Sequence, residues 1–415
     1  MKLLAFLILL IISNTVFSQK EIDIVKCEAQ FLEKNLLLIA SNFNIEASRA
    51  LTIQCKLWEN PIFSADVNAF NPNNKKPFDV GSHGEKAFQI QQVISLGGKR
   101  YNQVQYAKVN EQIAEYEFQD LLRNLKYELR KSFYLVYFNN KKIQTTNIQI
   151  NNVDSLVKAF EVQTQKGNLP LKELVRLESL LLKFKNTRID LINNNIKEQS
   201  NLQLLLNENQ IIIPMIIEEK VLEKYLIAEI KDSKSLDSLA FINRPDYQIS
   251  MKNIEANEWN VKLQKSLAIP NLNLGGSYDQ RGGAFNNQIN LTVGIPIPLL
   301  NRNQGNIKYA NVILDQSKID QELVILTLKI EIAAAVSRWN EAKKNYSEFP
   351  LSKINDFDIV YEGVLNNFKK RNISVLEFTD FMESYNEMAI QFDDFEKNII
   401  VTGEELNNTI NSTIF

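Results

Sequence analysis

The chain has 415 residues, of which only 13 are glycine and 10 are proline, and its formal net charge is −2. A charge this close to zero provides no basic field for a nucleic acid, so no nucleic-acid partner is expected. Glycine and proline interrupt helices, and their scarcity predicts long stretches of uninterrupted helix.

The first 18 residues have the parts of a secretory signal peptide. Lys2 supplies a positive charge, Leu3–Ile12 form an apolar run too short to span a bilayer, and the small Ser18 is a suitable residue before a cleavage site. No later segment approaches the roughly 18 consecutive apolar residues of a transmembrane helix. We therefore expect an exported chain without such a helix.

Residues 19–60 are expected to form an N-terminal helix, and residues 61–97 the first of two β-hairpins. Apolar and polar side chains alternate in its first arm, Ile62–Ala69, which indicates a strand with one apolar face. The second arm ends at two glycines that precede two basic residues, in the order Gly97, Gly98, Lys99 and Arg100.

A long helix is predicted directly after this hairpin. Lys99–Gln165 contains no glycine or proline, and about 67 residues at about 1.5 Å each give a rod of roughly 100 Å. The helices of this half, residues 98–206, are expected to turn back at Lys166–Leu171. Gly167 can adopt the left-handed conformation that ends a helix, and Pro170 favours the start of the next one.

Residues 207–244 interrupt the helical pattern. Ile211–Pro214 is expected to be a short strand or an extended piece, and Lys231–Leu239 is charged and rich in serine. A helix over residues 245–269 then leads to the second hairpin, residues 270–300.

The second hairpin begins with a strand at Asn271–Tyr278, and its second arm, residues 288–299, alternates strictly. One face carries Ile289, Leu291, Val293, Ile295, Ile297 and Leu299, and the other carries Gln288, Asn290, Thr292 and Gly294. Pro296 and Pro298 cannot donate to a sheet, so strand pairing should end there. Three residues that follow, Asn301, Asn303 and Gly305, offer turn and helix-capping chemistry.

The second half of the chain repeats the first. Residues 301–402 begin with a run of about 65 residues with helical spacing, and they turn back at Lys370–Val375, about 204 residues after the first turn. Arg371 occupies the position of Gly167, which leaves the geometry of this turn open. We predict an internal duplication of helix, hairpin, long helix, turn and helix, and a polar, frayed tail over residues 403–415.

The number of strands has a consequence for assembly. Four strands of about 8–12 residues are long enough to cross an outer membrane but too few to close a barrel with a lumen. Because open edges are not tolerated in lipid, spanning strands require several chains. Three chains would supply twelve strands, with Gln288, Asn290 and Thr292 facing the lumen. The alternative is that the two hairpins pair in a small soluble sheet.

These residues carry a resemblance to the TolC family of outer-membrane efflux proteins. The sequence is most similar to the CzcC-like branch, which partners heavy-metal efflux pumps. The resemblance rests on Ser95–Arg100, on Gly294–Gly305 and above all on the string from Pro296 to Asn306, with support from Phe31–Leu36 and Leu57–Pro61. It extends from about residue 21 to about residue 400.

The resemblance implies a homotrimer with a twelve-stranded β-barrel in the outer membrane, continued by an α-helical barrel in the periplasm, with residues 207–244 as an equatorial region. Family members are the exit duct of a tripartite pump, joined to a periplasmic adaptor and an inner-membrane, proton-driven transporter of the RND type. The tip turns would dock the adaptor and form the gate region, through Gly167, Asn168, Leu169, Leu171, Asn372, Ile373 and Val375. The junctions between barrel and helices would comprise Gly97, Gly98, Lys99, Arg100, Pro296, Pro298, Asn301, Arg302 and Gly305.

The expected function is therefore a channel that exports heavy-metal cations, with drug efflux or type I protein export as alternatives. A periplasmic structural coiled coil without channel activity is the competing hypothesis from another class. We predict no enzyme activity and no catalytic, cofactor-binding or metal-binding residues, because no His/Cys cluster has the spacing of metal ligands. His83 is expected in an external loop. Cys27 and Cys55, about 42 Å apart on one predicted helix, are too distant for a disulfide.

Overall fold

The computed structural model describes residues 19–216, 221–228, 233–282, 284–348 and 352–415. The predicted signal peptide, residues 1–18, lies outside the described residues. The contacts divide the chain into two compact units. The first unit comprises the chain up to Ala40, Asp120–Arg244 and Thr327–Phe415, and the second comprises Ser41–Gln119 and Pro245–Leu326. None of the described helices is long and apolar enough to cross a membrane.

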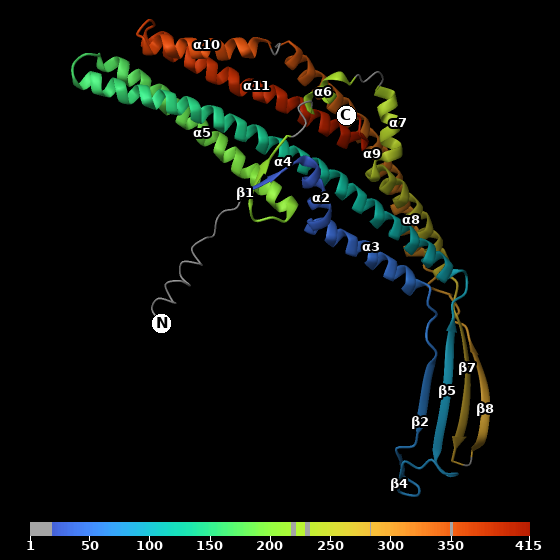
Figure 1. Ribbon diagram of the computed structural model, residues 1–415. Coiled ribbons are helices and arrows are strands. Elements are labelled where there is room, and N and C mark those ends of the chain that lie inside the picture. Colours follow the sequence, from blue (N-terminus) through green and yellow to red (C-terminus); the bar gives the residue numbers. More distant parts are fainter. Residues whose placement is uncertain (1–18, 217–220, 229–232, 283, 349–351) are drawn as a thin grey trace, which may run out of the picture. The chain divides into compact units, whose positions relative to one another are not determined.

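The second unit contains a four-stranded antiparallel sheet in the order β2-β5-β7-β8, which forms one end of the unit (Figure 1). Its strands are β2 (Ile62–Val67), β5 (Glu85–Ile94), β7 (Leu272–Arg281) and β8 (Phe285–Gly294). A small ladder of β3 (Phe70–Asn71) and β4 (Lys76–Pro77) lies in the connection between β2 and β5. Both predicted hairpins are therefore confirmed, and the two hairpins pair with each other through β5 and β7.

Four helices contribute to the second unit: α3 (Leu36–Cys55), α4 (Lys99–Gln165), α8 (Pro245–Leu267) and α9 (Gln304–Ser347). The predicted helix over Lys99–Gln165 is confirmed, and its 67 residues contain no break. Val109, Ile113 and Ala256 form a small buried core between α4 and α8.

The first unit contains α2 (Ile24–Lys34), α5 (Leu171–Leu206), α6 (Val221–Ile227), α7 (Ser233–Asn243), α10 (Ser352–Lys369) and α11 (Val375–Ile410). It also contains a two-stranded parallel sheet of β1 (Gln19–Ile22) and β6 (Ile211–Pro214). Strand β6 confirms the extended piece expected over these residues.

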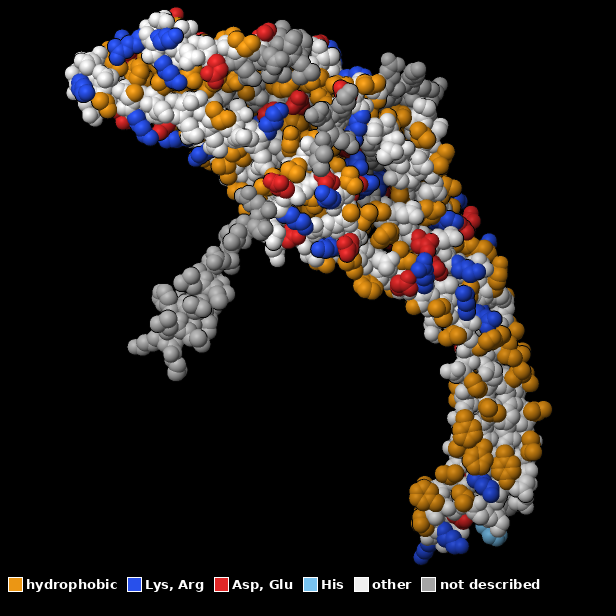
Figure 2. Space-filling view, in the orientation of Figure 1, with side chains coloured by type: hydrophobic (Ala, Val, Ile, Leu, Met, Phe, Trp, Pro, Cys, Tyr) orange, Lys and Arg blue, Asp and Glu red, His pale blue; other side chains and the backbone are white. Residues whose placement is uncertain are grey.

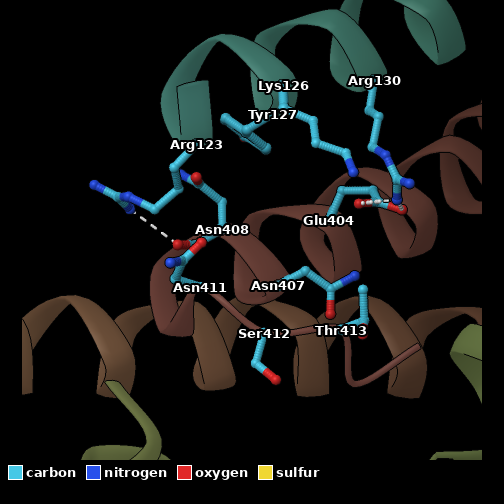
Figure 3. A pocket seen from close by; sticks show the side chains of 10 residues that line it. All are labelled: Arg123, Lys126, Tyr127, Arg130, Glu404, Asn407, Asn408, Asn411, Ser412 and Thr413. Carbon is cyan, nitrogen blue, oxygen red and sulfur yellow. Dashed lines mark hydrogen bonds and ion pairs between the residues drawn. The ribbon is translucent and has the colours of Figure 1, made fainter. Parts of the chain in front are cut away.

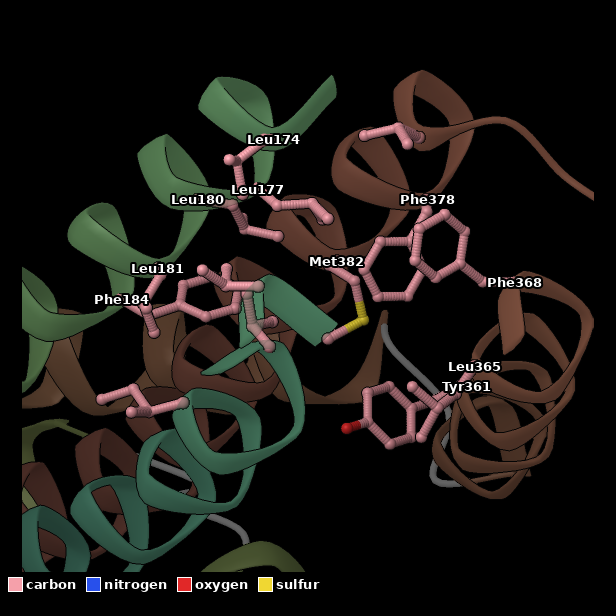
Figure 4. Close-up of a cluster of buried hydrophobic side chains, with 14 residues drawn as sticks. Leu174, Leu177, Leu180, Leu181, Phe184, Tyr361, Leu365, Phe368, Phe378 and Met382 are labelled. Carbon is pink, nitrogen blue, oxygen red and sulfur yellow. The ribbon is translucent and has the colours of Figure 1, made fainter. Parts of the chain in front are cut away.

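The main core of the first unit lies where α4, α5, α10 and α11 pack against one another (Figure 4). Its buried side chains include Phe184, Phe378 and Met382, and the rings of Phe368 and Phe378 stack with centroids 4.0 Å apart. Each half of the duplicated sequence supplies two of these four helices.

Two predicted helices are each divided in the structure. Residues 19–60 were expected to form one helix, but α2 and α3 are separated at Asn35, so Cys27 and Cys55 lie on different helices. The buried Asn35 side chain donates to the Leu205 carbonyl at 2.9 Å and accepts from the Leu38 amide at 3.0 Å, an arrangement that competes with continuous helix. The run of about 65 residues after residue 301 is likewise divided into α9, which ends at Ser347, and α10, which begins at Ser352.

Candidate functional site

The sheet has one apolar face and one polar face. Directly paired residues project from the same face of a sheet, and Phe88 pairs with Tyr278, which pairs with Ile289. Figure 2 shows hydrophobic side chains over the strands. Ile289 and Leu291 are 80% and 88% exposed, although both are large and apolar. The predicted alternation is therefore confirmed, and its apolar side is uncovered in the single chain.

The opposite face is polar and contains carboxylates from different strands. Asp66 pairs with Ala87, Ala87 with Asp279, and Asp279 with Gln288, so these residues form one row across the four strands. Glu85 and Arg281 pair one step further along on the same face. The Arg281 guanidinium lies 3.3 Å from both Glu85 and Asp279. This face therefore carries three carboxylates and one cation on its described strands.

Strands β2 and β8 are the two edges of this sheet. In the described chain each of them pairs on one side only, with β5 and β7 respectively. Unpaired strand edges present a row of free backbone donors and acceptors. Beside an uncovered apolar face, such edges are unfavourable unless another strand covers them.

The first junction between strand and helix requires glycine. Gly97 and Gly98 have φ values of +72° and +73°, a region that residues with a Cβ atom rarely occupy. A Cβ atom on Gly97 would also lie 2.5 Å from Cδ1 of Ile269. Lys99 then begins α4 and donates a hydrogen bond to the Asn271 side chain at the start of the second hairpin.

The second junction has the same plan with different residues. Strand β8 ends at Gly294, before Pro296 and Pro298, as the prolines predict. Asn303 has a φ of +57° and its carbonyl accepts from the Ile307 amide, which is the position that Gly98 has before α4.

Two further junction residues show how this turn is closed. The side chain of Asn301 accepts from the Asn303 amide at 3.0 Å, and the Arg302 amide donates to the Gln304 side chain at 2.8 Å. Gly305 was expected in the turn, but it lies inside the first turn of α9, and a Cβ atom there would have no contact within 4 Å. It is therefore not required by this geometry.

The two tip turns have the same backbone geometry. In the first, the amides of Gly167 and Asn168 donate to the carbonyls of Thr164 and Gln163. In the second, the amides of Arg371 and Asn372 donate to Phe368 and Asn367 in the same pattern. This pattern is the Schellman motif, which requires a left-handed residue after the helix. Gly167 has a φ of +75° and Arg371 a φ of +62°. The two turns therefore have the same geometry, although the second has arginine where the first has glycine.

The helix that follows the second tip has a side-chain cap at its N-terminus, whereas the helix after the first tip has none. The Ser374 side chain accepts from the Glu377 amide, and the Glu377 carboxylate accepts from the Ser374 amide at 2.8 Å, which forms a capping box. The hydrogen bonds from the Ser374 backbone and side chain lower the pKa of Glu377 below its ordinary value. In the first tip, Pro170 occupies this position without a side-chain cap.

The apolar tip residues are less exposed than the sequence suggested. The sequence predicts that Leu169, Leu171, Ile373 and Val375 are exposed unless an adaptor covers them. Leu169 and Ile373 are half-buried, and Val375 is buried in the main core of the first unit, so this prediction is wrong for these three. Leu171 is exposed. Val375 belongs to the buried cluster of α4, α5, α10 and α11, and Ile373 packs against this cluster. Two neighbours outside the predicted set, Val175 and Leu376, are exposed as well.

Substitutions of the left-handed residue in each tip turn should change the free energy of unfolding in opposite directions. We expect Arg371→Gly to raise the free energy of unfolding by about 0.5–1 kcal/mol, and Gly167→Ala to lower it by about 1 kcal/mol, because only glycine occupies this region without steric cost. Urea unfolding followed by circular dichroism measures both. Equal signs for the two variants would show that the turn geometry does not control stability here.

A pocket of about 330 Å³ lies between α4 and the end of α11 (Figure 3). Two of its cations contact α11: Arg130 lies 2.8 Å from Glu404, and Arg123 donates to the Asn408 carbonyl at 2.9 Å. These contacts hold the C-terminal segment against α4. The aromatic ring of Phe415 also packs on Tyr225 and Trp339, with centroids 5.3 Å apart in each case.

The prediction of a frayed tail over residues 403–415 is therefore wrong. Helix α11 continues to Ile410, and Leu406 and Ile410 are completely buried. The composition of this segment is polar because several of its asparagine and glutamate side chains face partners on other helices.

Chemistry for catalysis or metal binding was not expected. Within the described residues, no three His, Cys, Asp or Glu side chains lie close enough together to hold a metal ion. His83 lies in an exposed turn before β5. Both cysteines are free thiols, and burial raises the pKa of Cys27 to about 12. The absence of a dedicated metal site in the whole protein stays a prediction.

Comparison of the sequence with protein-family models finds no match, and no curated protein matches it significantly. The structure, in contrast, superposes on outer-membrane channels over nearly its whole length. CusC, whose structures concern folding and transmembrane channel formation, is 16% identical, with 94% of this chain and 92% of CusC covered and a TM-score of 0.74.

Two further channels are similar. The CmeC outer membrane channel of Campylobacter jejuni is 13% identical, with 93% and 85% of the two chains covered and a TM-score of 0.73. The MtrE outer membrane channel of Neisseria gonorrhoeae is 13% identical, with 94% and 89% covered and a TM-score of 0.72.

The chain has the TolC-like fold. The predicted fold class is thereby confirmed, since these channels superpose on 93–94% of this chain with TM-scores of 0.72–0.74. At sequence identities of 12–16% the similarity shows the TolC-like fold, but it does not identify the transported substrate.

Proposed function

We propose that three copies of this chain form the outer-membrane exit duct of a tripartite efflux system. The duct exports heavy-metal cations, together with a periplasmic adaptor and an inner-membrane transporter of the RND type. The observation that carries this proposal is the four-stranded sheet, which has an uncovered apolar face, a polar face and two unpaired edges, and which leads directly into the 67-residue α4.

The exposed apolar face and the unpaired edges of the sheet are explained best if the sheets of several chains join into one closed barrel. Only a closed barrel satisfies every backbone group within lipid, and pairing β8 of one chain with β2 of the next removes both edges at once. Three chains then supply twelve strands. The apolar face meets lipid, and the row that contains Asp66 and Asp279 faces the lumen.

The long helices have a surface suited to the same assembly. On α9 the exposed apolar residues recur at intervals of three, four and seven: Tyr309, Val312, Ile319, Leu323, Leu326 and Ile330. This spacing is typical of a coiled-coil seam. In the proposed trimer it packs on helices of neighbouring chains and extends the barrel into the periplasm.

The tips are the proposed adaptor site. Between α5 and α11, next to the tip turns, lies a groove of about 510 Å³. Val175 and Leu376 form its apolar part, and charges of both signs surround them, among them Arg176 and Asp380. Exposed apolar side chains within a polar rim are typical of protein interfaces. A helical hairpin of the adaptor would cover them.

Membrane fractionation and single-channel recording test the channel directly. The mature chain should be found in the outer-membrane fraction, and the purified protein should produce stepwise conductance in planar bilayers. A periplasmic coiled coil without channel activity would be soluble on fractionation and silent in the bilayer. That result would overturn the proposal.

Two observations support cation export. The Pro296–Asn306 string resembles the CzcC-like branch, and the polar face of the sheet has a net negative charge. We expect the double variant Asp66→Asn/Asp279→Asn to lower the cation-to-anion permeability ratio by about threefold or more, because both carboxylates would line the lumen. Reversal potentials in a potassium chloride gradient measure this ratio. The control is Asn290→Asp, which adds a carboxylate to the same face and should raise the ratio.

The transported substrate has its own test. Deletion of the gene should sensitise cells to zinc, cobalt or copper more than to detergents. Sensitivity to detergents alone would overturn heavy-metal export and favour drug efflux, while the channel itself would stand.

A further inference from the structure

The helices carry an excess of cations where they meet the sheet. We define the junction collar as residues 55–61, 95–110, 259–271 and 295–314, all in the second unit. It contains eight cations, Lys56, Lys99, Arg100, Lys108, Lys262, Lys265, Arg302 and Lys308, and a single carboxylate, Glu59. The next carboxylates along the helices are Glu111, Glu258 and Asp315. The chain as a whole has a net charge of −2, so this concentration of positive charge is local.

These cations form no ion pairs among the described residues, although Glu59 attracts Lys99 at longer range. Within the described residues, none of the eight forms an ion pair with a carboxylate, whereas Arg49, Lys252 and Lys318 further along the same helices all do. Lys99 is half-buried and hydrogen-bonds to the neutral side chain of Asn271. Burial lowers the pKa of Lys99 below its ordinary value. Six of the eight cations are exposed, and Lys99 and Arg100 are half-buried. A group of eight cations with a single carboxylate attracts an external anion.

Aromatic side chains accompany the cations. The Arg100 guanidinium lies over the ring of Trp58 at 4.0 Å from its centroid, and the Lys262 ammonium lies over Trp259 at 3.9 Å. Trp58 is exposed, and so is Tyr101, which meets Trp259 edge to face. Two of the three tryptophans of the chain are thus in the collar. Tryptophan and tyrosine are enriched where a membrane protein meets lipid headgroups.

A pocket of about 400 Å³ brings these features together. Trp58, Lys99, Arg100 and Asn271 line it, at the point where α3 ends and α4 begins. The carboxylate of Glu59 lines it as well, so the pocket holds two cations and one anion. It lies beside the first junction of strand and helix. Figure 2 shows Lys and Arg side chains on the helical surface next to the sheet.

We infer that the junction collar binds the anionic headgroups of phospholipids in the periplasmic leaflet, with a lipid phosphate seated between Lys99 and Arg100 beside Trp58. The inference rests on the proposed function, because it requires the sheet to lie in the outer membrane with its helices on the periplasmic side. The guanidinium of Arg100 suits a phosphate group through paired N–H donors. The exposed Trp58 and the half-buried Trp259 would lie at the level of the headgroups.

The test uses the full chain, with Trp339→Phe, reconstituted into phosphatidylcholine vesicles. Trp339 is buried in the first unit, so its removal leaves the two collar tryptophans as reporters. Traces of brominated phosphatidylglycerol or brominated phosphatidylcholine are added, and quenching of tryptophan fluorescence reports which lipid is next to the collar. We expect about threefold or stronger preference for the anionic lipid, weakened by high salt. Excess inorganic phosphate should leave the preference unchanged.

Variants distinguish an effect of the collar cations on lipid preference from an effect of positive charge elsewhere on the chain. Lys99→Gln/Arg100→Gln should reduce the preference to about one, and the single variant Lys262→Gln, at an exposed position, should reduce it in part even if the double variant fails to fold. The matched control Lys172→Gln/Lys185→Gln removes two exposed cations near the tips and should have no effect. Equal quenching by both lipids in the parent chain would overturn the lipid site alone. A chain that does not float with the vesicles would overturn the membrane location and the lipid site together.

Discussion

Gly97→Ala is expected to lower the free energy of unfolding of the second unit by about 2–5 kcal/mol. Two costs add at this position. A left-handed backbone costs a residue with a Cβ atom roughly 1–2 kcal/mol, and the φ of Gly97 is +72°. The new Cβ atom would also lie 2.5 Å from Ile269, and overpacking of this kind costs about 1–3 kcal/mol. Thermal unfolding of the purified chain, followed by circular dichroism, measures the loss.

The matched control is Gly305→Ala at the other junction. Gly305 lies in the first turn of α9 with open space around it, so alanine there should be neutral or stabilising by up to about 1 kcal/mol. Adding Ile269→Ala to Gly97→Ala should recover the steric part of the loss and leave the backbone part. If both glycine variants had the same stability, the junction geometry would not be what selects glycine at position 97.

Arg130→Met is expected to cost about 3–5 kcal/mol, because it leaves the buried carboxylate of Glu404 without its cation. The Arg130 guanidinium lies 2.8 Å from Glu404 and also pairs with Glu28. Burial opposes the charge of Arg130, but the two carboxylates outweigh it and raise its pKa above the ordinary value. The hydroxyl of Tyr225 donates a further hydrogen bond to Glu404. Urea unfolding gives the free energy.

The neighbouring ion pair provides the control. Arg338 lies 2.7 Å from Glu405, the residue next to Glu404, but the two side chains are 51% and 27% exposed. Arg338→Met should therefore cost no more than about 1 kcal/mol. A similar loss for both variants would mean that burial does not decide the strength of these ion pairs.

The helices and the sheet faces could be predicted because their signals are local. The absence of breakers over Lys99–Gln165 predicted α4 to the residue, and the alternation from Gln288 onward predicted which side of β8 is apolar. The double prolines after Gly294 predicted where pairing ends. Each of these depends on the backbone preferences of a few consecutive residues.

The features that were missed depend on distant partners. Asn35 divides α2 from α3 through a hydrogen bond to Leu205, 170 residues away. The segment after Gly403 looked polar and frayed, yet Glu404 meets Arg130, 274 residues away. No local pattern contains these contacts.

The surfaces proposed to be functional were predictable in part. The tip turns and junctions were found from motifs, whereas the row of Asp66 and Asp279 required the register between β2, β5 and β7. The cations of the collar were visible in the sequence one by one. These cations come from four separate segments of the chain, and only the fold brings the segments together where the helices meet the sheet.

Disulfide cross-linking between sheet edges tests the central claim, that three chains close one barrel, most directly. Ser64→Cys in β2 is combined in turn with Asn290→Cys and Thr292→Cys in β8, all on the polar face, in a Cys55→Ser background. Cys27 can remain, because its side chain is completely buried. After oxidation in the outer membrane, at least one pair should give covalent dimers and trimers and nothing larger. Monomers from every pair, or a ladder that continues beyond the trimer, would contradict the trimeric duct.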